Sequence, residues 1–173
     1  DASLSPADEW ALLLRRFPSV AVQFADAGAV HPIQRTARLQ RRVERAAGPN
    51  WAMLPHAAYF LDPLFSAGNA HTLLGIERLI QILESTENRD VRLAAYDRRL
   101  QAEIDHLDRI IHGAYRGFAG FDLFAAYSMF YFAAATFSEE ERCAGRHSDD
   151  DAFLLAHDER FRAALEAGYE RVC

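Results

Sequence analysis

Residues 67–172 carry a helical pattern almost throughout, and this stretch limits the fold more than any other feature. In 67–85 and again in 89–112, apolar residues recur every three or four positions, as on one side of a helix. Residues 121–137 are apolar on nearly every side, which predicts a buried helix, and 159–172 predict an amphipathic one. On one side of the helix over 67–85 we expect Leu73, Ile76, Leu79, Ile80 and Leu83.

The first third of the chain is less regular. Ser5 and Pro6 form a strong helix start, and Pro18 separates that helix from a shorter one over 19–27. Residues 33–47 fit either a helix or a solvated, arginine-bearing strand, with the strand favoured. After a turn at 48–50, residues 51–54 predict a buried strand.

The predicted fold class is therefore mainly α with a minor β element of one or two strands. Two strands make no sound sheet alone, because exposed edges need partners. Either the strands are minor or they pair with sequence outside this chain, and we favour the second. The first residue, Asp1, also suggests a chain cut from something longer.

Composition narrows the classes of function. The 173 residues suit a single domain, and a net charge of −6 argues against nucleic acid or an anionic membrane as the main partner. All 19 basic residues are arginine, so no lysine of this chain can act in catalysis. Cys143 and Cys173 are expected to be free thiols, and the N-terminus is no signal peptide, so we expect a cytoplasmic protein. Residues 118–137 are marginal for a membrane span and include Asp122.

The segment 54–68 carries the most information. Small residues lead into Asp62-Pro63, and Ser66, Ala67 and Gly68 then open a long helix. Ser66 is a good cap, and the two small residues leave the first helical N–H groups uncovered. This helix start is either a plain cap or a site for an anion or an electron-rich ligand.

The stretch 62–68, Asp-Pro-Leu-Phe-Ser-Ala-Gly, resembles the D-P-x-F-S-x-G stretch of flavin-dependent halogenases and related FAD oxidoreductases. Those proteins share the hydroxybenzoate-hydroxylase type of FAD fold. The resemblance extends through 51–58 and 70–79 and, more weakly, to about Phe137. It implies that this chain is the C-terminal part of an FAD-dependent oxidoreductase that halogenates or oxygenates an organic substrate.

The resemblance also implies a site. Asp62, Pro63, Ser66, Ala67 and Gly68 would line the isoalloxazine side of FAD, and in a halogenase the N–H groups of Ala67 and Gly68 would hold the halide. His56 stands where many members have an aspartate that binds the sugar-alcohol chain of the flavin, and it could donate to the same oxygen. The resemblance assigns no catalytic residue here.

Two departures bear on the chemistry. Phe65 occupies the position where tryptophan-type halogenases have glutamate, whereas phenol and pyrrole halogenases have Phe there. Neither the G-x-G-x-x-G fingerprint, nor the W-x-W-x-I-P segment, nor the halogenase lysine occurs. All three belong to the N-terminal part of such enzymes, so the expected partners are that FAD-binding part, a small aromatic or other organic substrate, and a halide in the case of halogenation.

These expectations suggest a division of the single unit 1–173. Residues 1–54 would end the sheet region, 55–85 would form the flavin-side loop and helix, and 86–173 would form a C-terminal helical region. The alternative is a free-standing, non-catalytic helical module that binds a protein partner through apolar surface near 51–54.

Several other residues have two interpretations. His71 is a structural histidine or faces a substrate. The aspartates of 149–151 begin a short helix and lack the spacing of a calcium loop. A polar group on one helix either meets solvent, which we favour, or binds a metal: Asp105, His106, Asp108, Arg109 and His112. An aromatic group is either core, again favoured, or the wall of a substrate pocket: Phe118, Phe121, Phe124, Tyr127, Phe130, Tyr131 and Phe132.

Overall fold

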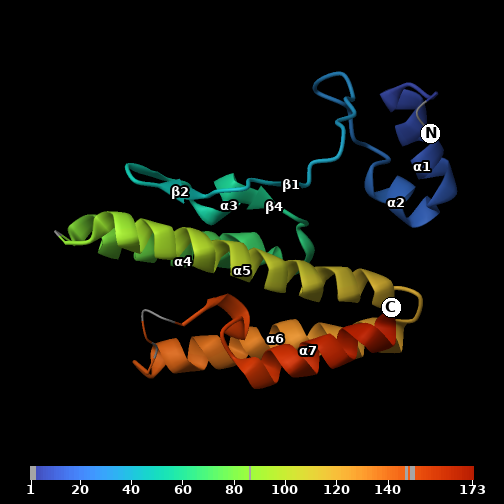
Figure 1. Ribbon diagram of the computed structural model, residues 1–173. Coiled ribbons are helices and arrows are strands. Elements are labelled where there is room, and N and C mark those ends of the chain that lie inside the picture. Colours follow the sequence, from blue (N-terminus) through green and yellow to red (C-terminus); the bar gives the residue numbers. More distant parts are fainter. Residues whose placement is uncertain (1–2, 86, 147, 149–150) are drawn as a thin grey trace. The chain divides into compact units, whose positions relative to one another are not determined.

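The computed structural model describes residues 3–85, 87–146, 148 and 151–173 (Figure 1). Its internal contacts divide the chain into two compact units, 1–39 and 40–173, which are described separately. The division into 1–54, 55–85 and 86–173 stays a prediction.

The first unit is a pair of short helices, α1 (Pro6–Arg16) and α2 (Pro18–Gln23). The Ser5 hydroxyl accepts a hydrogen bond from the Asp8 N–H at 3.2 Å, which confirms the predicted helix start. Pro18 begins α2, so the break between the helices is confirmed as well. Trp10 and Phe24 meet edge to face, with ring centroids 5.0 Å apart.

The described residues of the second unit form four strands of two residues each, where one or two were predicted. Antiparallel β1 (Arg41–Arg42) and β4 (Tyr59–Phe60) form one pair. The other pair is a hairpin of β2 (Ala47–Gly48) and β3 (Trp51–Ala52), closed by the expected turn. The strands pair with one another in twos, and each two-stranded pair keeps open outer edges. That these edges pair with sequence outside this chain stays a prediction.

Exposure also differs from the prediction at 51–54. Trp51 and Ala52 are exposed rather than buried, and Met53 and Leu54 are half-buried.

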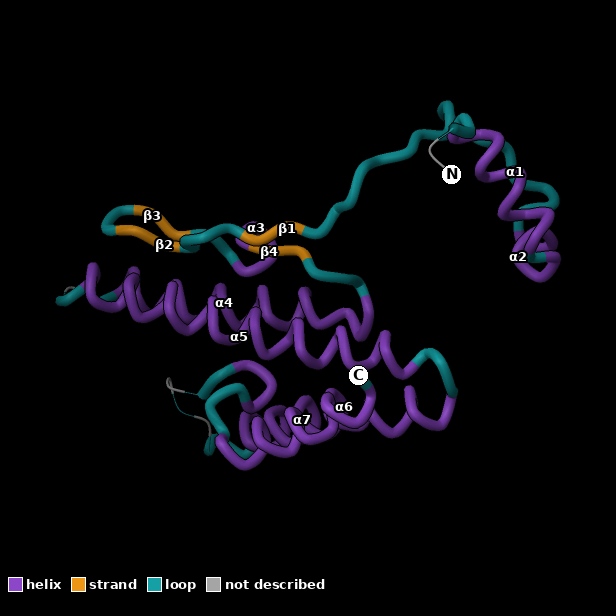
Figure 2. Tube along the Cα trace, turned by 45° about the vertical axis from the view of Figure 1, so that its right-hand side comes forward, coloured by secondary structure: helices purple, strands orange, loops and turns teal. Residues whose placement is uncertain are grey.

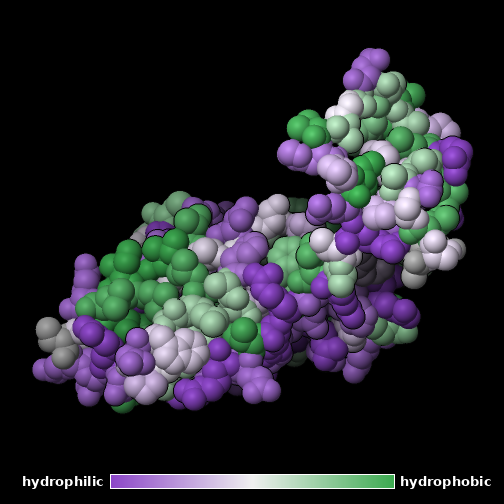
Figure 3. Space-filling view, turned by 90° about the horizontal axis from the view of Figure 1, so that it is seen from above, coloured by the Kyte–Doolittle hydropathy of each residue, from purple (hydrophilic) through white to green (hydrophobic). Residues whose placement is uncertain are grey.

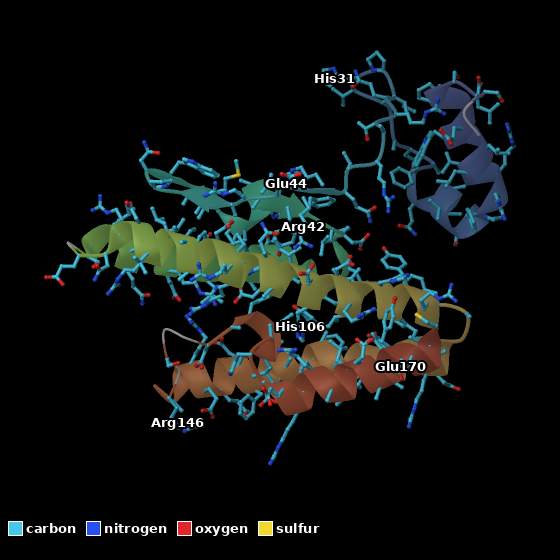
Figure 4. The ribbon with its side chains drawn as sticks, in the orientation of Figure 1. His31, Arg42, Glu44, His106, Arg146 and Glu170 are labelled. Atoms are coloured by element: carbon cyan, nitrogen blue, oxygen red, sulfur yellow. The ribbon has the colours of Figure 1, made fainter. Side chains whose placement is uncertain are left out.

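Over 33–47 no helix forms, and strand structure is confined to Arg41–Arg42 and Ala47. The expected solvated arginines are present there. Arg42 lies above α5, where it donates to Gln101 at 2.9 Å (Figure 4).

Helices make up most of this unit, as predicted. They are α3 (Pro55–Ala58), α4 (Ala67–Glu84), α5 (Arg89–Gly117), α6 (Phe121–Cys143) and α7 (Glu159–Val172), with 3-10 turns η1 (Leu64–Ser66) and η2 (Phe153–Leu155). The strands and α3 lie on one side of the α4–α5 pair, and α6 and α7 lie on the other (Figures 1 and 2). Because α5 is in the middle, its Leu100, Ile104, Leu107 and Ile110 are at most 1% exposed.

The faces of α4 are largely reversed relative to the prediction. Leu73, Ile76, Ile80 and Leu83, expected together on one apolar side, are 37–65% exposed. Leu79, expected on the same side, is half-buried and packs against the core. The buried side carries small and polar residues instead: Ala67, His71, Gly75 and Arg78, with Ile82. Burial of this side depends on close packing, since a Cβ on Gly75 would lie 2.4 Å from Pro55 Cδ.

Helix α6 is also less buried than predicted. Phe121 is 79% exposed, and Met129, Phe132 and Phe137 are each more than half exposed. Figure 3 shows the opposite side, which carries the strands, and hydrophobic side chains gather over part of that side as well. Such large exposed apolar surface is typical of a contact with another part of a protein.

Three remaining expectations concern smaller features. The two cysteines are free and exposed. No helix among the described residues is long and apolar enough to cross a membrane. The helix predicted to begin at 149–151 starts largely outside the described residues, and the nearest short helix is η2.

Candidate functional site

The segment between β4 and α4 forms a tight, strained turn. Phe65 (φ 64°, ψ −1°) and Ser66 (φ 54°, ψ 24°) both adopt left-handed backbone conformations, and Ala67 (φ −57°) returns to the right-handed region. Such conformations are costly for residues other than glycine and cluster at functional sites. Ser66 is the N-cap residue of α4, as predicted, but its side chain makes no capping hydrogen bond. The first N–H groups of α4 therefore lack that partner.

Side chains of α5 and α6 hold this turn. Asp62 accepts hydrogen bonds from the Leu64 N–H and from the Tyr115 hydroxyl, each at 2.8 Å. The bond to Asp62 raises the pKa of Tyr115. Tyr131 donates to the Phe65 carbonyl at 3.1 Å, and the two rings stack with centroids 4.5 Å apart. The Asp62 carboxylate thus stabilises the loop, a role that sequence reasoning did not assign to it.

A shallow cavity of about 130 Å³ lies beside the turn. Five of the six residues predicted to contact the cofactor line it: His56, Asp62, Pro63, Ser66 and Gly68. The sixth, Ala67, is 1% exposed and does not line the cavity. Ligand pockets are commonly 300–1,000 Å³, so this cavity is large enough for only one side of a site.

The wall opposite Gly68 is His56. A Cβ built on Gly68 would lie 3.1 Å from His56 Nδ1, which is closer than most side-chain contacts. The His56 backbone is fixed on both sides, because its N–H donates to the Thr72 hydroxyl and its carbonyl accepts from Arg41. The His56 ring can lie this close to the backbone at residue 68 because the residue there is glycine.

A buried ionic network, which sequence reasoning missed, lies behind the turn. Glu103 of α5 is fully buried and accepts four hydrogen bonds of 2.7–2.8 Å: one from His71, two from Arg78 and one from the Phe153 N–H. Burial acts to raise the pKa of Glu103, but the bonds from His71 and Arg78 outweigh it and lower the pKa to about 2. Glu103 is therefore ionised at neutral pH. The other ring nitrogen of His71, Nδ1, lies 2.7 Å from the Tyr59 hydroxyl.

Of the two interpretations of His71, the network supports the structural one. Its ring is fully buried and stacks on Phe153, with centroids 4.4 Å apart. It does not line either of the cavities described here. The ring therefore holds other groups in place and does not meet a ligand directly.

The polar group on α5 does not come together as a metal site. Among the described residues, no cluster of three or more His, Cys, Asp or Glu side chains could hold a metal ion. His106 faces α6 and α7 rather than solvent (Figure 4), and its Nε2 lies 2.9 Å from the Leu154 carbonyl oxygen. Burial lowers the pKa of His106. His112 instead meets the Tyr169 hydroxyl at 2.6 Å.

A larger cavity of about 600 Å³ lies between α4, α6 and residues 151–157. Leu73, Leu74, Tyr131 and Phe153 are among its apolar walls, and Arg142 pairs with Glu77 at 2.8 Å on its polar side. Tyr131 is the one member of the predicted aromatic group that lines it. Because Tyr131 also stacks on Phe65, the cavity adjoins the strained turn.

Comparison with known proteins places the chain in a family. The model of the tryptophan halogenase family matches residues 21–117, which is more than half of the chain. The chain therefore belongs to the tryptophan halogenase family. This confirms the resemblance drawn from residues 62–68.

Two curated relatives agree with this assignment. The chain is 31% identical over 169 residues to monodechloroaminopyrrolnitrin halogenase PrnC of Pseudomonas fluorescens. That alignment covers 95% of the chain and 28% of the relative. It is 32% identical over 124 residues to tetracycline 7-halogenase of Kitasatospora aureofaciens, covering 69% of the chain and 22% of that relative. The chain thus spans less than a third of the length of these relatives.

The fold is shared with a solved halogenase. The structure of halogenase PltM in complex with phloroglucinol and FAD aligns with 98% of the chain and 38% of PltM, with a TM-score of 0.77 at 18% identity. At that identity the likeness supports the fold alone. The mainly helical architecture is accordingly that of a flavin halogenase over part of its length.

Proposed function

We propose that this chain is the C-terminal part of an FAD-dependent halogenase with a hydroxybenzoate-hydroxylase-type fold, and that its residues 56–68 face the flavin ring. The observation that carries the proposal is the shallow cavity at the start of α4. The turn that bounds it is strained, and five of the residues that the family resemblance assigns to the cofactor line it. Membership of the tryptophan halogenase family supplies the class of reaction.

The residues present fit a flavin edge. Gly68 has no side chain that would extend over the cavity, and the His56 ring that lies against it offers a nitrogen at the cavity wall. The N-terminus of α4 carries a partial positive charge that favours electron density on the bound ring. FAD, when bound, would supply the redox chemistry that oxidises a halide or oxygenates an organic substrate.

The same backbone supports a halide site. Successive N–H groups at a reversal between left-handed and right-handed conformations form a concavity that attracts anions. Here that reversal falls between Ser66 and Ala67. Halide would bind to the N–H groups of Ala67 and Gly68, as the resemblance implies. Halogenation is therefore favoured over oxygenation as the reaction.

An organic substrate would enter the larger cavity beside the turn. The volume of this cavity suits a small aromatic molecule. Tyr131 lines the cavity and stacks on Phe65 of the turn. PltM was solved with the aromatic compound phloroglucinol, and the two curated relatives are named for halogenating aminopyrrolnitrin and tetracycline compounds. This supports a small aromatic or related organic substrate for the complete protein, which we place in the cytoplasm.

Partial length explains the exposed apolar surface. Leu73, Ile76, Ile80 and Leu83 would pack against the FAD-binding part that the family resemblance implies, since the chain spans only 28% of the length of PrnC. Their burial would contribute about 25 cal/mol for each Å² of apolar surface removed from water. The flavin would then lie between that part and the turn.

The test is a titration of the complete protein with FAD, followed by the quenching of flavin fluorescence. Gly68→Val should weaken binding at least tenfold, because a branched side chain would displace the His56 ring and extend into the cavity that both residues line. Gly120→Val is the matched control, since a Cβ there meets nothing within 4 Å. Equal affinity of the Gly68→Val variant and the wild type would refute the flavin-facing role. A wild type that binds no FAD would favour the non-catalytic module.

A further inference from the structure

A single buried hydrogen bond joins the two ends of the strained turn. Tyr59 belongs to β4, which enters the turn, and His71 lies one helical turn after Ala67 in α4, which leaves it (Figure 1). The Tyr59 hydroxyl and His71 Nδ1 are 2.7 Å apart, and both residues are at most 3% exposed. This contact therefore ties β4 directly to α4.

Glu103 determines which of the two groups, the Tyr59 hydroxyl or His71 Nδ1, donates the hydrogen bond. Its ionised carboxylate can only accept hydrogen bonds, so His71 Nε2 carries the proton that it receives. In the neutral ring Nδ1 is then the acceptor, and the Tyr59 hydroxyl donates to it. Arg78 and the Phe153 N–H occupy the remaining positions of the carboxylate. Glu103 thus holds the His71 ring in one orientation.

We propose that Tyr59 and His71, oriented by Glu103, are positioning residues that hold the turn at 61–66 in the shape that receives the flavin ring. The inference rests on the proposed function. Consecutive left-handed residues persist only where the surroundings determine them fully. Tyr115 and Tyr131 hold the middle of the turn through Asp62 and Phe65, whereas Tyr59 and His71 hold its ends.

If Tyr59 contributed only to stability, its loss would not affect flavin binding. A matched pair of variants separates that case from the proposed positioning role. Tyr59→Phe removes one buried hydroxyl beside the turn. Tyr96→Phe removes an equally buried hydroxyl, which donates to the Met53 carbonyl at 2.8 Å, away from the turn. Both variants should lower the melting temperature by a similar amount, since each loses one buried hydrogen bond. Their effects on the flavin should differ.

His71→Gln is a second, independent change. The amide of Gln can still donate to Glu103 near the position of Nε2, but it presents no acceptor to Tyr59 in place of Nδ1. Arg78 and Glu103 then remain paired, so the core should still fold. Tyr59→Phe and His71→Gln each remove the same Tyr59–His71 hydrogen bond. The double variant therefore loses no more of this contact than either single variant does.

The experiment is an FAD titration of the complete protein in the wild type and these four variants, together with the visible absorbance spectrum of the bound flavin. We expect Tyr59→Phe and His71→Gln each to raise the dissociation constant about 5- to 10-fold and to shift the spectrum, with the double variant no weaker than the single ones. Tyr96→Phe should bind as the wild type does. The proposal is overturned if Tyr59→Phe binds like Tyr96→Phe, or if the two losses multiply in the double variant. A wild type without FAD affinity would overturn the proposed function and this inference together, whereas unchanged variants of a wild type that binds FAD overturn the inference alone.

Discussion

Replacing Glu103 by Gln should cost far more stability than any surface change of the same kind. The carboxylate accepts four hydrogen bonds at a fully buried position, two on each oxygen. The amide group of Gln has one acceptor oxygen, so two of the four donors lose their partner, and the charge of buried Arg78 is left uncompensated. Each unsatisfied donor costs about 1–3 kcal/mol, and breaking a buried ion pair costs about 3–5 kcal/mol. Because these effects overlap, we expect a loss of about 3–5 kcal/mol.

Glu77→Gln is the matched control for that change. Glu77 also binds an arginine through both oxygens, at 2.8 and 3.0 Å from Arg142, but their side chains are 51% and 37% exposed. An exposed pair of this kind contributes about 0–1 kcal/mol. Urea denaturation of the complete protein, followed by circular dichroism, would measure both free energies of unfolding. Similar losses below 1 kcal/mol in the two variants would refute the account of the buried network.

Two further predictions concern stability. The ionised Glu103 has a pKa of about 2 in the folded state, below its ordinary value of 4.5, so its stabilisation is complete above pH 4.5 and is lost as the pH falls towards 2. The loss amounts to about 3 kcal/mol, and urea denaturation at pH 6 and pH 3 should show most of it in the wild type and little in Glu103→Gln. Gly75→Ala should destabilise by about 1–3 kcal/mol, because its Cβ would lie 2.4 Å from Pro55 Cδ. Gly120→Ala, with nothing within 4 Å of its Cβ, should shift the melting temperature much less, and equal shifts would contradict the packing argument.

The helices were predictable because each is encoded within its own segment. Apolar spacing located α4, α5 and α7, and α7 begins and ends at the predicted residues. The orientation of α4 was not predictable in this way. An apolar side suggests burial, but here the side with His71 and Arg78 is buried because Glu103, which is 32 and 25 residues further along the chain, accepts hydrogen bonds from both of them.

The candidate site shows the same limit. Its lining could be predicted from sequence, because residues 62–68 are contiguous and resemble a family motif. The left-handed backbone at Phe65 was not predictable, since only glycine and a few polar residues adopt that conformation readily. The contacts that hold it come from Tyr115 and Tyr131, which are more than 45 residues away along the chain. Nothing local in the sequence links them to the turn.

The flavin-facing role of the turn is the central claim, and hydrogen exchange of the complete protein with and without FAD tests it most directly. The N–H groups of Ala67 and Gly68 lie in the first turn of α4, where no preceding carbonyl is available within the helix, and they should exchange quickly in the free protein. The account predicts that FAD slows exchange at these two residues and at Ser66. Protection by FAD elsewhere in the protein, with exchange at residues 66–68 unchanged, would contradict it.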